Sequence, residues 1–265
     1  MMIESWVKVE ALLDSLERNS MAHTICVWAL PRLEELLLQL EDMIEKQDLS
    51  EVKEEKTPDQ VLDEHPQQSL NMTLNRQAIG QVRKLIQRLV IMVDATEKTV
   101  IRSLQRQLHE DTRQLRKWIE QHCTYTIDQL QPWLIQEQIE DFYVLRQTEW
   151  GRLVIAGSRD YSYYHNVELI FHEVQFLMLP TQVFTVERIR LATAEERADL
   201  NRSMHGHEQM GRVFCLESSF EGTRYYVVAR QLEYNTDTVY YYNRPELGQG
   251  ERIAEYLLDP NKPDM

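Results

Sequence analysis

The chain has 265 residues, 43% of them hydrophobic and 27% charged, and its formal net charge at pH 7 is −14. This composition is ordinary for a globular protein, and the length allows one large domain or two smaller ones. The sequence argues against a membrane-spanning helix, because no apolar run approaches the roughly 18–20 residues that cross a bilayer. It also lacks the basic start and apolar core of a secretory signal.

The cysteines indicate the cellular compartment, and the scarcity of glycine argues against one class of binding site. Cys26, Cys123 and Cys215 lie far apart without a CxxC pair, which argues against a disulfide framework or a cysteine zinc site. We therefore expect buried thiols and a cytoplasmic protein. Glycine is scarce, and Gly80 is the only glycine before Gly151, so we expect no phosphate-cradling loop in the first half.

The negative charge is distributed unevenly along the chain. Residues 1–70 hold 16 acidic and 6 basic side chains, whereas residues 71–141 hold 9 acidic and 10 basic ones. A uniformly acidic surface would repel nucleic acid and anionic membranes. Residues 71–141 are not acidic overall, so their basic side chains can form a locally positive surface.

The N-terminal segment has the apolar spacing of amphipathic helices. We expect a first helix over 3–18, a second over 21–30, a kink at Pro31, and a third over 31–46. Residues 48–73 are acidic and poor in apolar side chains, so they cannot bury enough surface to offset their ordering entropy. They are expected to form a mobile acidic linker.

One long helix, predicted over about 76–122, is the element around which the first half is organised. It contains no proline, and apolar residues recur at steps of three and four, which puts them on one face. The members of this apolar face are Val82, Leu85, Ile86, Leu89, Val90, Val93, Val100, Ile101, Leu104, Leu108, Leu115, Trp118 and Ile119.

A cationic stripe lies nearly opposite that apolar face, at the same helical spacing. Its members are Lys98, Arg102, Arg106, His109, Arg113 and Lys117. Three interpretations remain open: a solvated helix face, a surface that pairs with an acidic protein surface, and a nucleic-acid contact. Base-stacking aromatic residues are missing from the stripe, which argues against RNA and single-stranded DNA.

From about residue 142, period-two alternation and β-favouring residues replace the helical pattern. Thr193 is placed to cap a short helix over 194–203, a turn at 235–238 suggests a hairpin, and a last helix is expected over 251–258. Closely spaced strands favour an antiparallel sheet. The predicted fold class is α+β, with a helical bundle in residues 1–141 and an antiparallel β-rich domain in residues 142–265.

The candidate chemistry of the second half lies in its histidines and tyrosines. The motif from Arg159 to His165 contains Tyr161, Tyr163 and Tyr164, and such groups can serve acid–base chemistry or bind a phosphate. Tyrosine also suits protein interfaces, because it combines apolar area with a polar tip. His172, His205 and His207 have no familiar metal-ligand spacing, so we expect no metal and no cofactor.

The first functional hypothesis is a non-enzymatic interaction or regulatory protein of the cytoplasm. Its partner-binding residues would be the cationic stripe together with Tyr161, Tyr163 and Tyr164, and its partner another protein with an acidic surface or a second copy of the chain. The alternative is an enzyme with an Arg/Tyr/His site in the β-rich domain. Nucleic-acid binding through the stripe is the third hypothesis.

Overall fold

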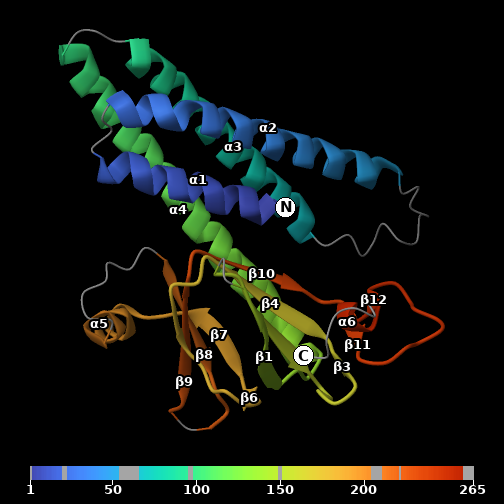
Figure 1. Ribbon diagram of the computed structural model, residues 1–265. Helices are drawn as coiled ribbons and strands as arrows, with labels where there is room; N and C mark the ends of the chain where they lie inside the picture. The colour runs from blue at the N-terminus through green and yellow to red at the C-terminus, as the bar shows by residue number, and fades with distance from the viewer. Residues whose placement is uncertain are drawn as a thin grey trace. The chain divides into compact units, whose positions relative to one another are not determined.

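The computed structural model describes residues 2–19, 23–53, 66–94, 98–148, 151–203, 211–220 and 222–258. It confirms the α+β class, with helices first and an antiparallel β region after them (Figure 1). The chain divides into two compact units, Met1–His122 and Cys123–Met265. We call them the helical unit and the β unit.

The helical unit is built from α1 (Met2–Arg18), α2 (His23–Lys53), α3 (Pro66–Asp94) and the first part of α4 (Lys98–Gln136). The single helix predicted over 76–122 is therefore wrong, since α3 and α4 share that stretch. Asp94, the last residue of α3, is a type that favours helix ends, but the stretch contains no proline and no nearby glycine to mark the break in the sequence.

Contacts between α3 and α4 show that the two helices pack antiparallel. Arg88 Nη1 donates to the Gln107 carbonyl at 3.0 Å and lies 2.5 Å from Asp111, while Lys84 lies 3.9 Å from the same carboxylate. Asp111 is 2% exposed, and burial raises the pKa of its carboxyl despite the two cations. The predicted apolar face thus folds back on itself.

Two helix boundaries also differ from the sequence prediction. α2 continues through Pro31, where Arg32 donates to the Trp28 carbonyl at 2.7 Å, instead of breaking into two helices. The linker predicted over 48–73 is partly helical, because α2 runs to Lys53 and α3 begins at Pro66. Residues 54–65 of that linker lie outside the described residues.

The core of the helical unit draws on α1, α2, α3 and α4, and it confirms most of the apolar face predicted over residues 82–119. The buried side chains include Trp6, Leu13, Leu16, Leu33, Leu40, Val82, Leu85, Leu89, Leu104, Leu108, Leu115 and Ile119. Val90 departs from the prediction and is 40% exposed. The side chains of Val100 and Ile101 lie outside the described residues. Among the described helices, none combines the length and apolar character needed to cross a membrane.

The β unit contains two larger antiparallel sheets and a small mixed one. The strands are β1 (Asp141–Gln147), β2 (Leu153–Ser158), β3 (Tyr164–His165), β4 (Val167–His172), β5 (Phe176–Met178), β6 (Phe184–Thr185), β7 (Arg188–Leu191), β8 (Arg212–Glu217), β9 (Arg224–Ala229), β10 (Gln231–Asn235), β11 (Thr238–Tyr240) and β12 (Glu251–Ile253). The sheet orders are β10-β4-β2-β1-β6, β5-β9-β8-β7 and β12-β11-β3.

Three chain segments belong to both larger sheets. β4 leads into β5, β6 into β7, and β9 into β10, each after a few residues. Backbone bonds continue the pairing across these joints, as between Arg230 N and His172 O at 2.9 Å and between Val186 N and Glu140 O at 3.0 Å. Pairing therefore runs in a closed circuit through β1, β2, β4/β5, β10/β9, β8 and β7/β6 and back to β1, the connectivity of a closed barrel.

One core fills the space between the two larger sheets. Phe171 of β4 and Phe214 of β8 meet edge to face with ring centroids 5.3 Å apart. The C-terminal part of α4 contributes Ile127, Leu130 and Leu134 to the same cluster. The change of character near residue 141 marks the start of β1, but the compact units part inside α4, because α4 supplies apolar residues to each core in turn.

Two local predictions for the end of the chain are wrong. β10 does not form a hairpin with β11, which pairs instead with β3 and β12. Asp237 N donates to Asn235 Oδ1 at 2.9 Å, so a short side-chain turn ends β10 there. The helix expected over 251–258 is strand β12 followed by the short α6 (Glu255–Leu258). The helix over 194–203 is confirmed as α5 (Ala194–Ser203).

Replacing Leu89 or Leu104 with alanine should lower the free energy of unfolding by about 2–5 kcal/mol, through lost transfer energy and a cavity. Leu89 is fully buried and Leu104 is 8% exposed. Urea unfolding would measure the loss, with Ile91→Ala as the control, because Ile91 is 55% exposed. Losses below about 0.5 kcal/mol at both leucines would contradict the packing described here.

Candidate functional site

One face of the small sheet gathers three tyrosine rings, of which Tyr240 is buried and Tyr242 is exposed. Tyr164 of β3 lies opposite Tyr240 of β11, with ring centroids 6.0 Å apart, and Tyr242 follows at 5.4 Å from Tyr240. Both pairs meet edge to face, and the Arg244 guanidinium stacks 4.6 Å from the Tyr240 ring centroid. We call these four residues the tyrosine face.

The remaining predicted tyrosines lie in the turn that enters β3. Tyr161 is 50% exposed and Tyr163 is 58% exposed, while the Tyr163 carbonyl accepts a backbone bond from Tyr241 N at 2.9 Å. Tyr242 is 45% exposed. The structure therefore places Tyr163 beside Tyr241 and Tyr164 opposite β11, while Tyr161 lies in the same turn as Tyr163.

The inner face of the same small sheet carries a buried chain of polar contacts. His165 is 1% exposed, with Nδ1 2.6 Å from the Tyr241 hydroxyl and Nε2 3.2 Å from Glu168. The Tyr241 hydroxyl also contacts the hydroxyl of Tyr143 on β1. At the other end, Arg252 of β12 lies 2.6 Å from Glu168. These contacts connect the small sheet to the five-stranded sheet, which contains β1 and β4.

The charge state of Glu168 sets the direction of these hydrogen bonds. Burial raises the pKa of Glu168, but the bonds from His165 and Arg252 outweigh it and bring the pKa down to about 2. The carboxylate therefore accepts from Nε2–H of His165, and in the neutral imidazole Nδ1 accepts from the Tyr241 hydroxyl. Burial raises the pKa of both Tyr143 and Tyr241, so the two hydroxyls stay protonated.

The described residues of the predicted Arg/Tyr/His site have separate contacts. Arg159 donates to the carbonyl and the carboxylate of Glu137, at the end of α4. His172 is bonded to Glu233 at 3.1 Å, on another part of the sheet. His205 and His207 lie outside the described residues. Over the part that is described, no group of three or more His, Cys, Asp or Glu is placed to hold a metal ion.

A cleft of about 1000 Å³ opens where the β6/β7 segment crosses between the two larger sheets. Its lining residues come from the end of α4, from the segment between α4 and β1, from β6/β7, and from the end of β8 and the residues after it. They are Gln131, Leu134, Ile135, Gln138, Ile139, Glu140, Thr185, Val186, Glu187, Arg188, Glu217 and Ser219. This volume is in the range of small-ligand and peptide sites.

Fixed polar contacts hold two parts of the cleft in place. The Gln131 amide accepts from Ile189 N and donates to the Glu187 carbonyl, both at 2.8 Å. The side chain thereby satisfies a backbone N–H and a backbone carbonyl at the edge of β7, as a neighbouring strand would. Hydroxyl contacts link Thr185 to Ser218 at 2.8 Å and to Ser219 at 3.0 Å. Among the described residues, neither serine has a histidine within its contacts, and no nucleophile–base pair is seen at these hydroxyls.

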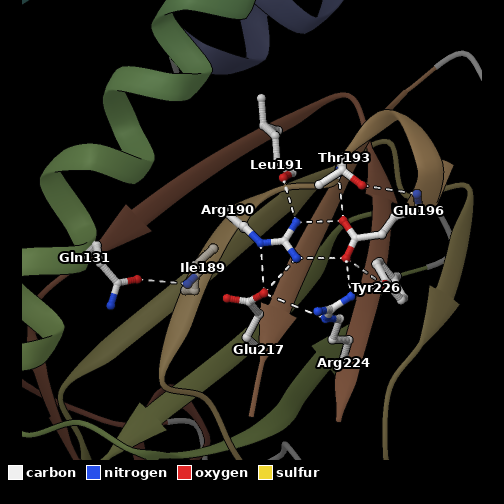
Figure 2. A network of polar contacts seen from close by, with 9 residues as sticks. All are labelled: Gln131, Ile189, Arg190, Leu191, Thr193, Glu196, Glu217, Arg224 and Tyr226. Carbon is white, nitrogen blue, oxygen red and sulfur yellow. Dashed lines mark hydrogen bonds and ion pairs between the residues drawn. The ribbon is translucent and has the colours of Figure 1, made fainter. Parts of the chain in front are cut away.

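An ionic network adjoins the cleft through Glu217 (Figure 2). Arg190 makes two bonds to Glu196, at 2.7 and 2.8 Å, and two to Glu217, at 2.7 and 2.9 Å. Arg224 and the Tyr226 hydroxyl also reach Glu196, at 3.0 and 3.2 Å. The network joins α5 to the outer faces of β7, β8 and β9.

The cap predicted at Thr193 is confirmed, and with Glu196 it forms a capping box that belongs to this network. Thr193 N donates to Glu196 at 2.7 Å, and Glu196 N is 3.3 Å from the Thr193 hydroxyl. The hydrogen bonds from Arg190 lower the pKa of Glu196 to about 2, while burial raises that of Tyr226 to about 12. Burial also raises the pKa of Cys215 to about 11, and all three cysteines are buried, as expected.

The cationic stripe of α4 divides into described and undescribed parts. Arg106, His109, Arg113 and Lys117 are exposed, as predicted for a face opposite the core. Arg113 bonds Glu110 of its own helix. The side chains of the other two members lie outside the described residues. These two members are Lys98 and Arg102.

One cation of α4 that engages the acidic N-terminal segment is Arg116, which the stripe omits; Arg83 of α3 also does so, with its Nε 2.7 Å from Glu41. The guanidinium of Arg116 lies 2.6 Å from Asp14, 2.7 Å from Glu17 and 4.0 Å from Glu10. Sequence reasoning missed Arg116 because it lies between the stripe and the apolar face. Its spacing from the leucines was the available signal, since a charge at the border of a core face can reach a neighbouring helix.

A scan of protein-family models and searches of curated proteins and solved structures find no match to this chain.

Glu196→Gln should weaken the β unit in a pH-dependent way. The pKa of Glu196 falls from 4.5 to about 2 on folding, so its ionised form stabilises the fold above about pH 4.5 and this stabilisation is lost as the pH falls towards 2. The difference in the free energy of unfolding between wild type and variant should shrink by about 2–4 kcal/mol between pH 7 and pH 2.

The control is Glu195→Gln, because Glu195 is the exposed neighbour in the same helical turn. When the free energy of unfolding is measured in urea across this pH range, the control and the wild type should differ by the same amount at every pH. A constant difference between Glu196→Gln and wild type at every pH would contradict the network.

Proposed function

We propose that this chain is a non-enzymatic, protein-binding component of the cytoplasm, and that the tyrosine face with Tyr161 and Tyr163 is its main recognition surface. One observation carries the proposal: Tyr161, Tyr163 and Tyr242 are each about half exposed, the first two in the turn that enters β3 and the third just after β11, the strand that pairs with β3. Half-exposed tyrosines supply large contact area at low entropic cost, and they concentrate in protein interfaces.

The buried chain beneath the small sheet supports this function by fixing the surface from behind. Tyr241 lies between Tyr240 and Tyr242 in the sequence, and its hydroxyl is bonded to His165. The backbone next to Tyr240 and Tyr242 is therefore held in place by the hydrogen bond of Tyr241. A recognition surface that is ordered before binding loses less conformational entropy when the partner arrives.

The enzymatic alternative rests on the contacts of His165 with Tyr241 and Glu168, a donor–acceptor series of the kind that moves protons. Against it, the imidazole is 1% exposed and Arg159 is engaged by Glu137. A scaffold explains both facts. We therefore place the enzyme second.

The tyrosine surface is tested by Tyr161→Ser, Tyr163→Ser and Tyr242→Ser combined. The variant should lose proteins that copurify with the wild-type chain, because it removes three exposed aromatic anchors. Quantitative mass spectrometry of the purified complexes measures the loss, and far-UV circular dichroism checks the fold.

The matched control combines Leu38→Ser, Ile91→Ser and Met178→Ser, which also replace large exposed apolar side chains but lie on α2, α3 and β5. It should retain the partners. Identical copurifying proteins for wild type, tyrosine variant and control would refute the proposed surface.

The cationic stripe is proposed as a second contact, with an acidic protein surface. Arg106→Glu, Arg113→Glu and Lys117→Glu combined should weaken association with copurified partners at low salt, and the effect should shrink as salt rises. The control reverses two exposed cations of α5, Arg197 and Arg202.

Binding of the wild type to duplex DNA and to RNA should be weaker than micromolar at about 0.15 M salt, since the chain carries a net charge of −14. Micromolar binding that the triple variant loses would favour the nucleic-acid hypothesis over protein pairing.

A further inference from the structure

We infer that the cleft of the β unit binds a short peptide segment of a partner protein in which a lysine or arginine is flanked by apolar residues. The inference rests on the proposed protein-binding function and adds to it a second site with a stated ligand chemistry. The cleft shares no residue with the tyrosine face, so the two sites can be tested separately.

The lining of the cleft supplies an apolar wall. Leu134, Ile139 and Val186 contribute buried side chains, each 3% exposed, while Ile135 is 67% exposed. An isoleucine left open to water at the border of a buried apolar surface contributes to binding when another apolar group covers it. This is the part of the site that apolar residues of the peptide would occupy.

The charges of the cleft favour a cation. Glu140 and Glu187 are exposed, and among the described residues neither carboxylate has a cationic partner. Glu217 is already held by Arg190, so it contributes little free charge. Arg188 is the one guanidinium in the lining, which leaves two unpaired carboxylates against one unpaired cation. The excess is negative, and a basic side chain complements it.

Hydrogen-bonding groups in the cleft suit a peptide main chain. The hydroxyls of Thr185 and Ser219 lie in the lining, and each hydroxyl donates and accepts. Gln138 adds an exposed amide from the end of α4. A free polyamine would use the carboxylates but leave the apolar wall and the hydroxyls uncovered, so the peptide makes the fuller match.

The cleft is also held in shape before any ligand binds. Gln131 ties the end of α4 to the β7 edge, and Arg190 fixes Glu217 within the network of Figure 2. Both residues line the cleft or contact its lining. A preformed site avoids the ordering cost that weakens binding by flexible segments.

The test is isothermal titration of the full chain with three probes. The first is the acetylated and amidated peptide Ala-Leu-Arg-Leu-Ala, the second carries citrulline in place of arginine, and the third is spermidine. The arginine peptide should bind about tenfold more tightly than the citrulline peptide, because citrulline keeps the shape of arginine but lacks its charge. It should also bind more tightly than spermidine.

Variants locate the binding within the cleft. Glu140→Gln with Glu187→Gln should weaken the arginine peptide about tenfold and leave the citrulline peptide unchanged. Ile135→Ser should weaken both peptides. The control is Glu246→Gln, an exposed carboxylate outside the lining, which should change neither.

Equal affinity for the arginine and citrulline peptides, tighter binding of spermidine than of peptide, or no measurable heat with any probe would each overturn the inference. The variant with serine at Tyr161, Tyr163 and Tyr242 distinguishes this failure from failure of the proposed function. It should still bind the arginine peptide. If no peptide binds while that variant loses its copurifying partners, only the cleft inference fails.

Discussion

The β unit depends on one constraint, that three chain segments each serve two sheets. Each of these segments forms backbone hydrogen bonds in both larger sheets, so pairing in one sheet also fixes the position of the other sheet. The segments are β4/β5, β6/β7 and β9/β10. Closing the circuit leaves few free strand edges and forces both inner faces to share one core, in which Phe171 meets Phe214. The cleft follows from the same constraint, because it opens where β6/β7 crosses between the sheets.

Strand alternation then separates scaffold from surface in the small sheet. Tyr164 and His165 are adjacent in β3, yet one joins the tyrosine face and the other is buried against Tyr241. Successive side chains of a strand point to opposite faces, so a single residue step divides the two roles. The same alternation places Val239 and Tyr240 on opposite faces of β11, although both side chains are buried. The exposed aromatic surface and its buried anchor are thus two sides of one short element.

Charged residues divide into those that hold the fold and those available for contacts. Arg190 and Arg116 are surrounded by carboxylates, at β7 and in the helical unit respectively. Such partly buried pairs are costly to break, because removing one partner leaves the other charge desolvated. Arg106 and Lys117 are exposed on α4, and Glu140 and Glu187 are exposed in the cleft. Recognition by charge is best sought among the second group, since its members are not committed to the fold.

The sequence by itself determined every feature that depends on neighbours a few positions apart. Helical spacing identified the buried positions around Leu89, alternation located the strands after residue 142, and Thr193 with the acids that follow it marked the start of α5. The α+β class follows from these local patterns, because period and capping are short-range properties.

Tertiary structure alone decided what depends on long-range partners. The fold-back between α3 and α4 replaces one predicted helix by two, since antiparallel packing of an apolar face buries more surface than a single extended helix can. Period-two alternation identifies a strand but does not determine its partners. The sequence therefore predicted a hairpin of β10 with β11, whereas β11 pairs with β3 and β12. His165 finds Tyr241 at a separation of 76 residues, and no local pattern encodes such a contact. Periodicity fixes which face of an element is buried; only the closed fold fixes what that face is buried against.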